Sequence, residues 1–192
     1  RVALVTNASA RGRDGTTTIE AFRRAADPEL VELFSPEHGL GADRDARIAD
    51  SHYEGLPVFS LYGDHFEPPP EALAGVDTIV FDLQDAGVRF YTYASTMRRA
   101  MRVAAAHGLR FVVLDRPNPL DGVDVQGPIF SGPESFVNHG ALPVRYGMTM
   151  GELARFFAAE DGTGSKVEIV PMRGWRRTDY WDSTGRDWVS PS

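Results

Sequence analysis

Short apolar runs alternate with longer amphipathic segments along most of the chain. The apolar runs are typical of buried strands, and they occur at 2–6, 31–34, 57–61, 78–83, 109–115 and 166–172. Segments with helical spacing lie between them, at 16–26, 92–107 and 149–160, and a helical turn begins within 68–73. Strands that alternate with helices form βαβ units. We therefore expect an α/β fold, a Rossmann-like and mostly parallel sheet with helices on both faces.

Two of the expected helices carry clear end signals. In the segment 92–107, Met97 and Met101 share one apolar face, and Gly108 is placed to end the helix. In the segment 149–160, Thr149 is the expected N-cap and Glu152 occupies the capping-box position. These signals predict the start or end of two helices, one after the fourth strand and one before the last strand.

The remaining segment, 174–192, is rich in Trp, Arg, Asp and Gly but shows no periodicity. We expect a Rossmann-like catalytic domain over 1–173, followed over 174–192 by a loop or the start of a truncated C-terminal domain. Because the sequence begins on a strand-like run without an initiator methionine, we also expect that an upstream segment has been removed.

Composition narrows the classes of partner. The 192 residues carry a net charge of −7, which argues against nucleic acid and anionic membranes because both require a basic face. No apolar run approaches the ~20 residues that span a bilayer, so no transmembrane segment is expected. The absence of cysteine excludes disulfides, thiolate metal sites and cysteine nucleophiles.

Polar side chains gather where the expected strands end. Parallel strands deliver their carboxyl ends to one edge of a sheet, where ligands of open α/β folds bind. The sequence therefore predicts a binding cleft at this edge. Its candidate residues are Asn7 after the first strand, Glu37 and His38 after the second, Asp82, Gln84, Asp85, Arg89, Tyr91 and Tyr93 at and beyond the fourth, and Asp115, Arg116 and Asn118 after the fifth.

Ordinary structural roles compete with this interpretation. Asp82 lies inside an apolar run, where a carboxylate is costly unless it is paired, so a buried salt bridge to Arg89 or Arg116 is an alternative. The tyrosines could be core residues with a hydrogen-bonded tip. The histidines follow no metal-ligand spacing, and the sequence contains neither a G-x-G-x-x-G nor a P-loop motif. We therefore expect no metal and no cofactor.

Glu37 and His38 stand between Pro36 and Gly39. A turn at this position needs only the proline and the glycine. The Glu37–His38 pair is not required by the turn, which marks it as candidate chemistry. A helix cap or an arginine partner is the alternative for the glutamate, and a satisfied structural histidine is the alternative for His38.

Several long stretches occur in the order and approximate spacing of one family. They are SPEHGLGAD, GLPVFSLYG, VFDLQDAGVRFYTYASTM, FVVLDRPNPLDG, VQGPIF, LPVRYGMTMGELARFF and WDSTGRDWVSPS. The chain thereby resembles the N-terminal domain of the exo-lytic β-N-acetylmuramidases, formerly a domain of unknown function. The resemblance runs from Arg1 to Ser192.

The resemblance implies a Rossmann-like domain followed by a smaller C-terminal domain that we expect to complete the cleft. It also implies a hydrolase of cell-wall recycling. This enzyme would be a glycosidase that releases N-acetylmuramic acid from non-reducing ends of peptidoglycan fragments. Glu37 is the catalytic residue that the resemblance favours. A non-catalytic carbohydrate-binding module and a deacylase of cell-wall sugars are the alternatives. A peptidoglycan substrate favours a secreted or cell-envelope location, although a cytoplasmic one is also compatible.

Glycoside cleavage needs an acid that protonates the leaving oxygen and a second group that acts as base or nucleophile. Glu37 suits the acid, while Asp82, Asp85 and Asp115 remain open as the second group, as does the substrate's N-acetyl group. Muramic acid carries a carboxylate on its lactyl group, and arginine is the side chain suited to bind a carboxylate with two hydrogen bonds. The candidates are Arg89, which we favour slightly, Arg116 and Arg145.

Overall fold

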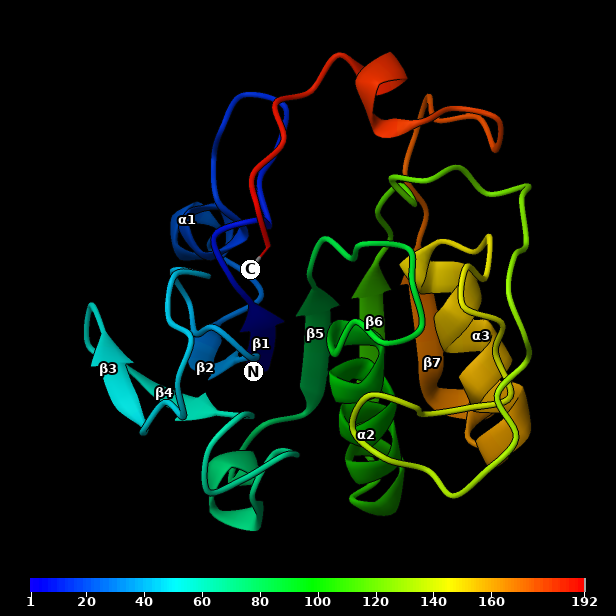
Figure 1. Ribbon diagram of the computed structural model, residues 1–192. Coiled ribbons are helices and arrows are strands. Elements are labelled where there is room, and N and C mark those ends of the chain that lie inside the picture. Colours follow the sequence, from blue (N-terminus) through cyan, green and yellow to red (C-terminus); the bar gives the residue numbers. More distant parts are fainter. Residues whose placement is uncertain (192) are drawn as a thin grey trace.

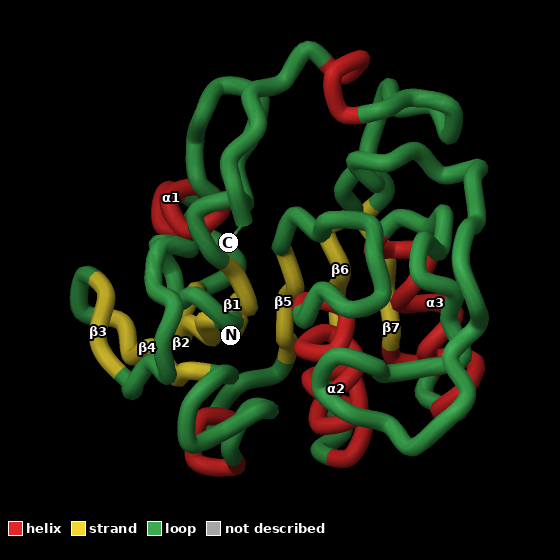
Figure 2. The backbone as a smooth tube through the Cα atoms, viewed as in Figure 1, coloured by secondary structure: helices red, strands yellow, loops and turns green. Residues whose placement is uncertain are grey.

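The computed structural model describes residues 1–191 as a seven-stranded sheet flanked by helices (Figures 1 and 2). The strand order is β3-β4-β2-β1-β5-β6-β7, and every neighbouring pair is parallel except the β3–β4 hairpin. The strands are β1 (Val2–Thr6), β2 (Leu30–Ser35), β3 (Ser51–Tyr53), β4 (Leu56–Ser60), β5 (Thr78–Asp82), β6 (Arg110–Leu114) and β7 (Val167–Val170). The expected mostly parallel α/β sheet is confirmed.

Three α-helices cover the two faces of the sheet unequally. They are α1 (Thr18–Arg24), α2 (Tyr93–Ala106) and α3 (Met150–Asp161), and 3₁₀ turns occupy Pro70–Leu73, Gly164–Lys166 and Trp181–Thr184. Helix α1 packs Ile19 against Leu4 and Val80 on one face. Helices α2 and α3 pack on the other face, where most of the buried core lies. The α1 face is therefore the thinner of the two layers.

The sequence pattern located the elements well but their ends less well. Thr149 and Glu152 form the expected capping box, and Thr17 with Glu20 forms a second one at the start of α1. Strand β3 has no counterpart among the predicted elements, because all three of its residues are exposed and it carries no apolar run. It is held by pairing to β4 alone, and such an edge strand leaves no hydrophobic signal.

The connections of the sheet reverse direction at β1. The chain leaves β1 through α1 toward β2, whereas β5 and β6 lie on the opposite side of β1. The carboxyl ends of β1 and β5 consequently flank a topological switch point, the place where open α/β sheets bind ligands. Asn7 follows β1 and Asp82 ends β5 at this position.

The tail beyond 174 folds back onto this edge of the sheet. Figure 1 shows the red C-terminal segment running beside the blue loop that follows β1. Arg186 Nη2 donates a hydrogen bond of 2.5 Å to the carbonyl of Arg11, which ties the two segments together. Over residues 1–191, no helix has the length and apolar character needed to cross a membrane.

Candidate functional site

The Glu37 turn presents a carboxylate held by hydroxyl groups. Gly39 N donates to Pro36 O at 3.0 Å to close the turn, and His38 adopts φ +68°, a left-handed conformation that is uncommon outside glycine. Thr92 Oγ1 donates to Glu37 Oε2 at 2.6 Å, and the Tyr62 hydroxyl also hydrogen bonds to the Glu37 side chain. The carboxylate is thus oriented by two neutral donors while the side chain remains half-exposed.

Tyr93 connects the Glu37 turn to the end of β1. Its hydroxyl accepts a hydrogen bond of 2.7 Å from Asn7 Nδ2, and its ring lies edge-on to Tyr91 at 4.9 Å. Burial raises the pKa of Tyr93 well above its usual value, and the nearby Tyr91, Glu37 and Asp85 raise that pKa further. Tyr93 therefore stays protonated, and it lies near enough to Glu37 and to Asp85 for the charge of each to raise its pKa.

Asp85 is a buried carboxyl group without a cationic partner. Its Oδ2 accepts hydrogen bonds from Gly87 N at 2.7 Å and from the Tyr146 hydroxyl. Its Oδ1 has no hydrogen-bond partner within the part of the chain that the structure describes. Burial raises the pKa of Asp85 to about 6, because its hydrogen bonds with Tyr146, Gly87 and Ala86 only partly offset the loss of water. This aspartate can exchange a proton near neutral pH.

Asp82 has a different environment, one that matches the structural alternative. The Arg116 guanidinium contacts it with both Nε and Nη2, and Thr18 Oγ1 donates to the same carboxylate. Both charged side chains are buried, so each requires the other. The sequence left Arg89 and Arg116 open as the partner of Asp82, and the structure pairs it with Arg116.

Asp115 connects β6 to the start of α3. It accepts hydrogen bonds from Gly151 N at 2.7 Å and from Thr149 Oγ1 at 3.1 Å. Burial raises the pKa of Asp115, and these contacts oppose that shift. Its carboxylate is occupied by the helix terminus, so of the three aspartates only Asp85 combines proximity to Glu37, through Tyr93, with a free oxygen.

Gln84 and Asn118 support the loops at this edge. Gln84 Nε2 donates to the carbonyls of Asp85 and Pro117, both at 2.9 Å. Asn118 Nδ2 donates to Met148 O at 2.9 Å. Both side chains are buried, and these hydrogen bonds join them to backbone carbonyls of the loops.

Two of the three candidate arginines, Arg89 and Arg145, contact the loop that precedes α3. Arg89 donates to the carbonyls of Pro128 and Leu142. Arg145 forms an ion pair with Asp121 at 2.8 Å. Their charge is thus directed at the loop before α3 rather than at the Glu37 turn.

The structure adds residues that sequence reasoning missed. Tyr62, Thr92 and Tyr146 each hydrogen bond to a candidate carboxylate. Tyr62 lies just beyond the carboxyl end of β4, so applying the strand-end rule to this short strand would have found it. Thr92 lies inside a stretch read only as a helix start, and Tyr146 is distant in sequence, so neither carried a signal.

The tail also reaches this site. Pro191 O accepts a hydrogen bond from Asn7 Nδ2 at 3.2 Å and another from the Tyr93 hydroxyl. His38 Nδ1 lies 3.0 Å from Arg44 O, and His38 lines a cavity of about 550 Å³ together with Asn7 and Arg11. In the described part of the chain, no group of three His, Cys, Asp or Glu side chains is arranged to hold a metal ion.

Comparison with known proteins identifies the family. The family model described as the N-terminal domain of the exo-β-N-acetylmuramidase NamZ matches residues 2–192. The chain belongs to this family. It is 40% identical over 198 aligned residues to the peptidoglycan β-N-acetylmuramidase NamZ of Bacillus subtilis (strain 168).

Solved structures agree with this family assignment. A DUF1343 family protein of Bacteroides fragilis NCTC 9343 superposes on the whole chain with a TM-score of 0.90 and 40% identity. A second DUF1343 protein of that organism superposes on 94% of the chain with a TM-score of 0.78 and 29% identity. The chain spans 48% of the Bacillus subtilis protein, and 50% and 49% of the two Bacteroides chains.

Proposed function

We propose that this chain is the part of a peptidoglycan exo-β-N-acetylmuramidase that carries the general acid, and that Glu37 is that acid. The observation that carries the proposal is the position of Glu37: a half-exposed carboxyl group beyond the end of β2, oriented by Thr92 and Tyr62, in a chain of the NamZ family. An acid with fixed geometry and access to solvent is what protonation of a glycosidic oxygen requires.

The proposed reaction hydrolyses one glycosidic bond. Glu37 gives its proton to the bridging oxygen as the C1–O bond of the terminal N-acetylmuramic acid breaks. A water molecule supplies the hydroxyl at C1, and a base removes the water's proton. We favour Asp85 as the second group because it has a free oxygen and titrates near neutral pH, and the substrate's N-acetyl oxygen is the alternative.

Substrate and location follow from the same proposal. The curated relative acts on peptidoglycan, and a muramyl sugar at its non-reducing end is the substrate we propose here. Because peptidoglycan lies outside the cytoplasmic membrane, we propose a secreted or cell-envelope location. The relatives are about twice as long, so we also propose that the second half of these proteins completes the cleft above Glu37.

The leaving group provides the sharpest test of Glu37. On a disaccharide, Glu37→Gln should lower kcat by on the order of 10²-fold or more, the scale of general acid catalysis. On 4-nitrophenyl N-acetyl-β-muramide the loss should be clearly smaller, because nitrophenolate departs without a proton. Glu71→Gln, at an exposed position, is the matched control and should change neither rate.

Other outcomes would point to other functions. Equal losses on both substrates, or near-normal turnover of the disaccharide, would contradict the acid role. Binding of muramyl sugars without any turnover by the full-length protein would indicate a carbohydrate-binding module. Release of acetate instead of sugar would indicate a deacylase.

A further inference from the structure

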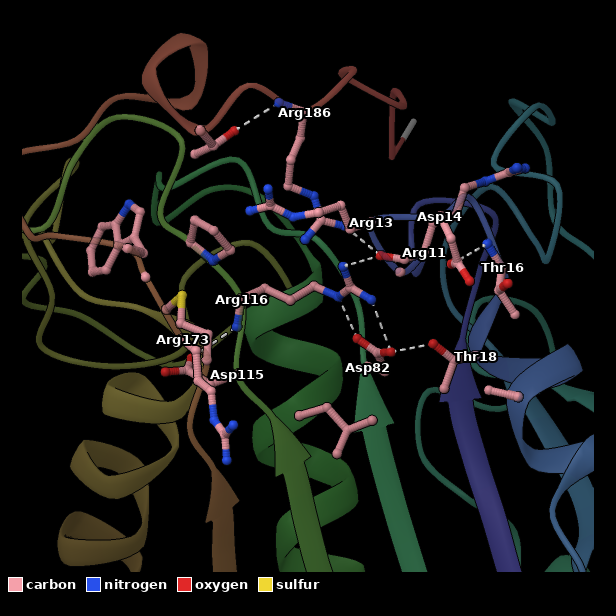
Figure 3. A pocket seen from close by; sticks show the side chains of 18 of the residues that line it. Arg11, Arg13, Asp14, Thr16, Thr18, Asp82, Asp115, Arg116, Arg173 and Arg186 are labelled. Carbon is pink, nitrogen blue, oxygen red and sulfur yellow. Dashed lines mark hydrogen bonds and ion pairs between the residues drawn. The ribbon is translucent and has the colours of Figure 1, made fainter.

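A second cavity opens on the α1 face of the same sheet edge. Glu37 lines neither this cavity nor the one beside His38 and Asn7. The second cavity has a volume of about 570 Å³ and is built from the loop before α1, the ends of β5 and β6, and the tail (Figure 3). Leu114 and Phe22 form its apolar floor and wall. Four segments far apart in sequence thus enclose one space beside the switch point.

The charges of this cavity do not cancel locally. Five arginines line it with four aspartates, and among described residues the only salt bridge between lining side chains joins Arg116 to Asp82. The other carboxylates are engaged elsewhere. Asp14 accepts from Thr16 N, Asp115 from the start of α3, and Asp179 from Arg176 N. The five arginines are Arg11, Arg13, Arg116, Arg173 and Arg186.

Two guanidinium groups meet at a single backbone oxygen. Arg116 Nη1 donates to Arg11 O at 3.2 Å, and Arg186 Nη2 donates to the same oxygen at 2.5 Å (Figure 3). Burial lowers the pKa of Arg186, and the positive charges of Arg116 and Arg13 lower it further. Like charges that approach this closely repel each other, and an anion between them would relieve the repulsion.

Arg13 completes the arrangement. Within residues 1–191 its guanidinium makes no hydrogen bond or ion pair, although Arg13 lines the cavity. It lies near enough to Arg186 for its charge to lower the pKa of Arg186. Its five donors are therefore available to a ligand. Arg186 likewise has donors left over after its bond to Arg11 O.

We infer that this cavity binds a carboxylate of an anionic ligand, with Arg13 and Arg186 as its donors and the Arg116–Asp82 pair as the fixed wall behind them. The muramyl identity of the ligand rests on the proposed function. The cavity and the one lined by His38 and Asn7 share Arg11 and Thr17, so both border the same stretch of the sheet edge. The carboxylate can come from the lactyl ether or from an attached peptide.

Binding measurements on the folded protein test this inference. Isothermal titration with N-acetylmuramic acid and with N-acetylglucosamine compares sugars that differ by the lactyl group. The muramic sugar should bind at least about tenfold more tightly, the scale of charge-assisted hydrogen bonds. Arg13→Gln should reduce that ratio by about tenfold, and Arg13→Lys by less, because lysine keeps the charge but loses the planar fork.

Matched variants separate local binding from general charge. Arg186→Gln should also lower the ratio, whereas Arg155→Gln, which removes an exposed arginine from α3, should not. Arg13→Gln is the decisive variant, because within residues 1–191 Arg13 makes no hydrogen bond or ion pair whose loss could unfold the site. The inference would be overturned if the folded Arg13→Gln and Arg186→Gln proteins bound N-acetylmuramic acid, N-acetylglucosamine and N-acetylmuramyl dipeptide with the same affinities as the wild type.

A third ligand distinguishes the two sources of the carboxylate. In N-acetylmuramyl dipeptide the lactyl group is an amide and the charge lies on the peptide. Arginine-dependent binding of this ligand alone would assign the cavity to the peptide, and binding of N-acetylmuramic acid would assign it to the lactyl group. If the full-length protein shows arginine-dependent binding but no hydrolysis, the proposed enzyme is refuted and this site stands. If it hydrolyses the substrate but binding does not depend on these arginines, this site is refuted and the proposed enzyme stands.

Discussion

Asp82 and Asp85 lie within one short stretch at the end of β5, and both are buried, yet they belong to opposite environments. Asp82 faces the α1 side, where Arg116 holds it as a carboxylate within a group of arginines. Among the described residues, the hydrogen-bond donors to Asp85 are neutral: the Tyr146 hydroxyl and the backbone amides of Gly87 and Ala86. The first is suited to fixing positive charge and the second to exchanging protons. Partners, rather than residue type, decide which role an aspartate has.

Removing one partner of the Arg116–Asp82 pair should produce the largest effect. Asp82→Ala leaves a buried guanidinium without a counter-charge, so the free energy of unfolding should fall by about 3–5 kcal/mol. Urea denaturation measures this loss. The double variant Asp82→Leu with Arg116→Met should recover a large part of it, because both charges are then absent. A double variant as unstable as the sum of its parts would show that the pair acts independently.

Asp85 should make stability depend on pH in the opposite direction from a salt-bridged carboxylate. Its pKa is about 6 in the folded chain and lower once unfolding exposes it to water. Its favourable contribution is complete below the unfolded pKa and is lost as the pH rises through about 6, a change of roughly 3 kcal/mol. Unfolding measured between pH 4 and 7.5 tests this.

Asp85→Asn provides the control for that measurement. The amide keeps an acceptor for Gly87 and Tyr146 but has no charge to bury, so the Asp85 contribution to the pH dependence should disappear. If the wild type and Asp85→Asn show the same pH dependence, the neutral-donor interpretation of this environment is wrong.

Thr92→Val should have the smallest effect, and it should fall on activity rather than stability. The substitution keeps the shape of the side chain but removes the 2.6 Å hydrogen bond that orients Glu37. On a disaccharide substrate, we expect kcat to fall roughly tenfold, the scale of one hydrogen bond to a charged group. Thr92→Ser restores the hydroxyl and should restore most of the rate. If Thr92→Val and Thr92→Ser both keep the wild-type rate, the Thr92 hydrogen bond is not needed and Tyr62 alone positions Glu37.

Sequence reasoning succeeded where a signal is local. Apolar runs located six of the seven strands, and the capping box at Thr149 was read directly from residue spacing. The strand-end rule also assembled Asn7, Glu37 and Asp85 at one edge, since parallel strands share their direction. The fully exposed β3 gave no such signal.

Pairings between distant residues could not be read from the sequence. Nothing local distinguishes Arg116, which pairs with Asp82, from Arg89, which binds the carbonyls of the following loop. Arg13 carries no local signal in the sequence, and its place near Arg186 depends on how the tail returns. The choice among three aspartates depended in the same way on which elements covered each of them.

The return of the tail has a consequence for biosynthesis. The bond between Arg186 and Arg11 joins positions 175 residues apart, and that between Asn7 and Pro191 joins positions 184 residues apart. Closing such long loops is a late event, because its entropic cost must be met before the contacts can form. On the ribosome, β1 and its loop are synthesised before the tail, so they cannot obtain these partners until residues 186 and 191 have been added. A nascent chain stalled before residue 186 would therefore carry a formed sheet with an open, solvated edge.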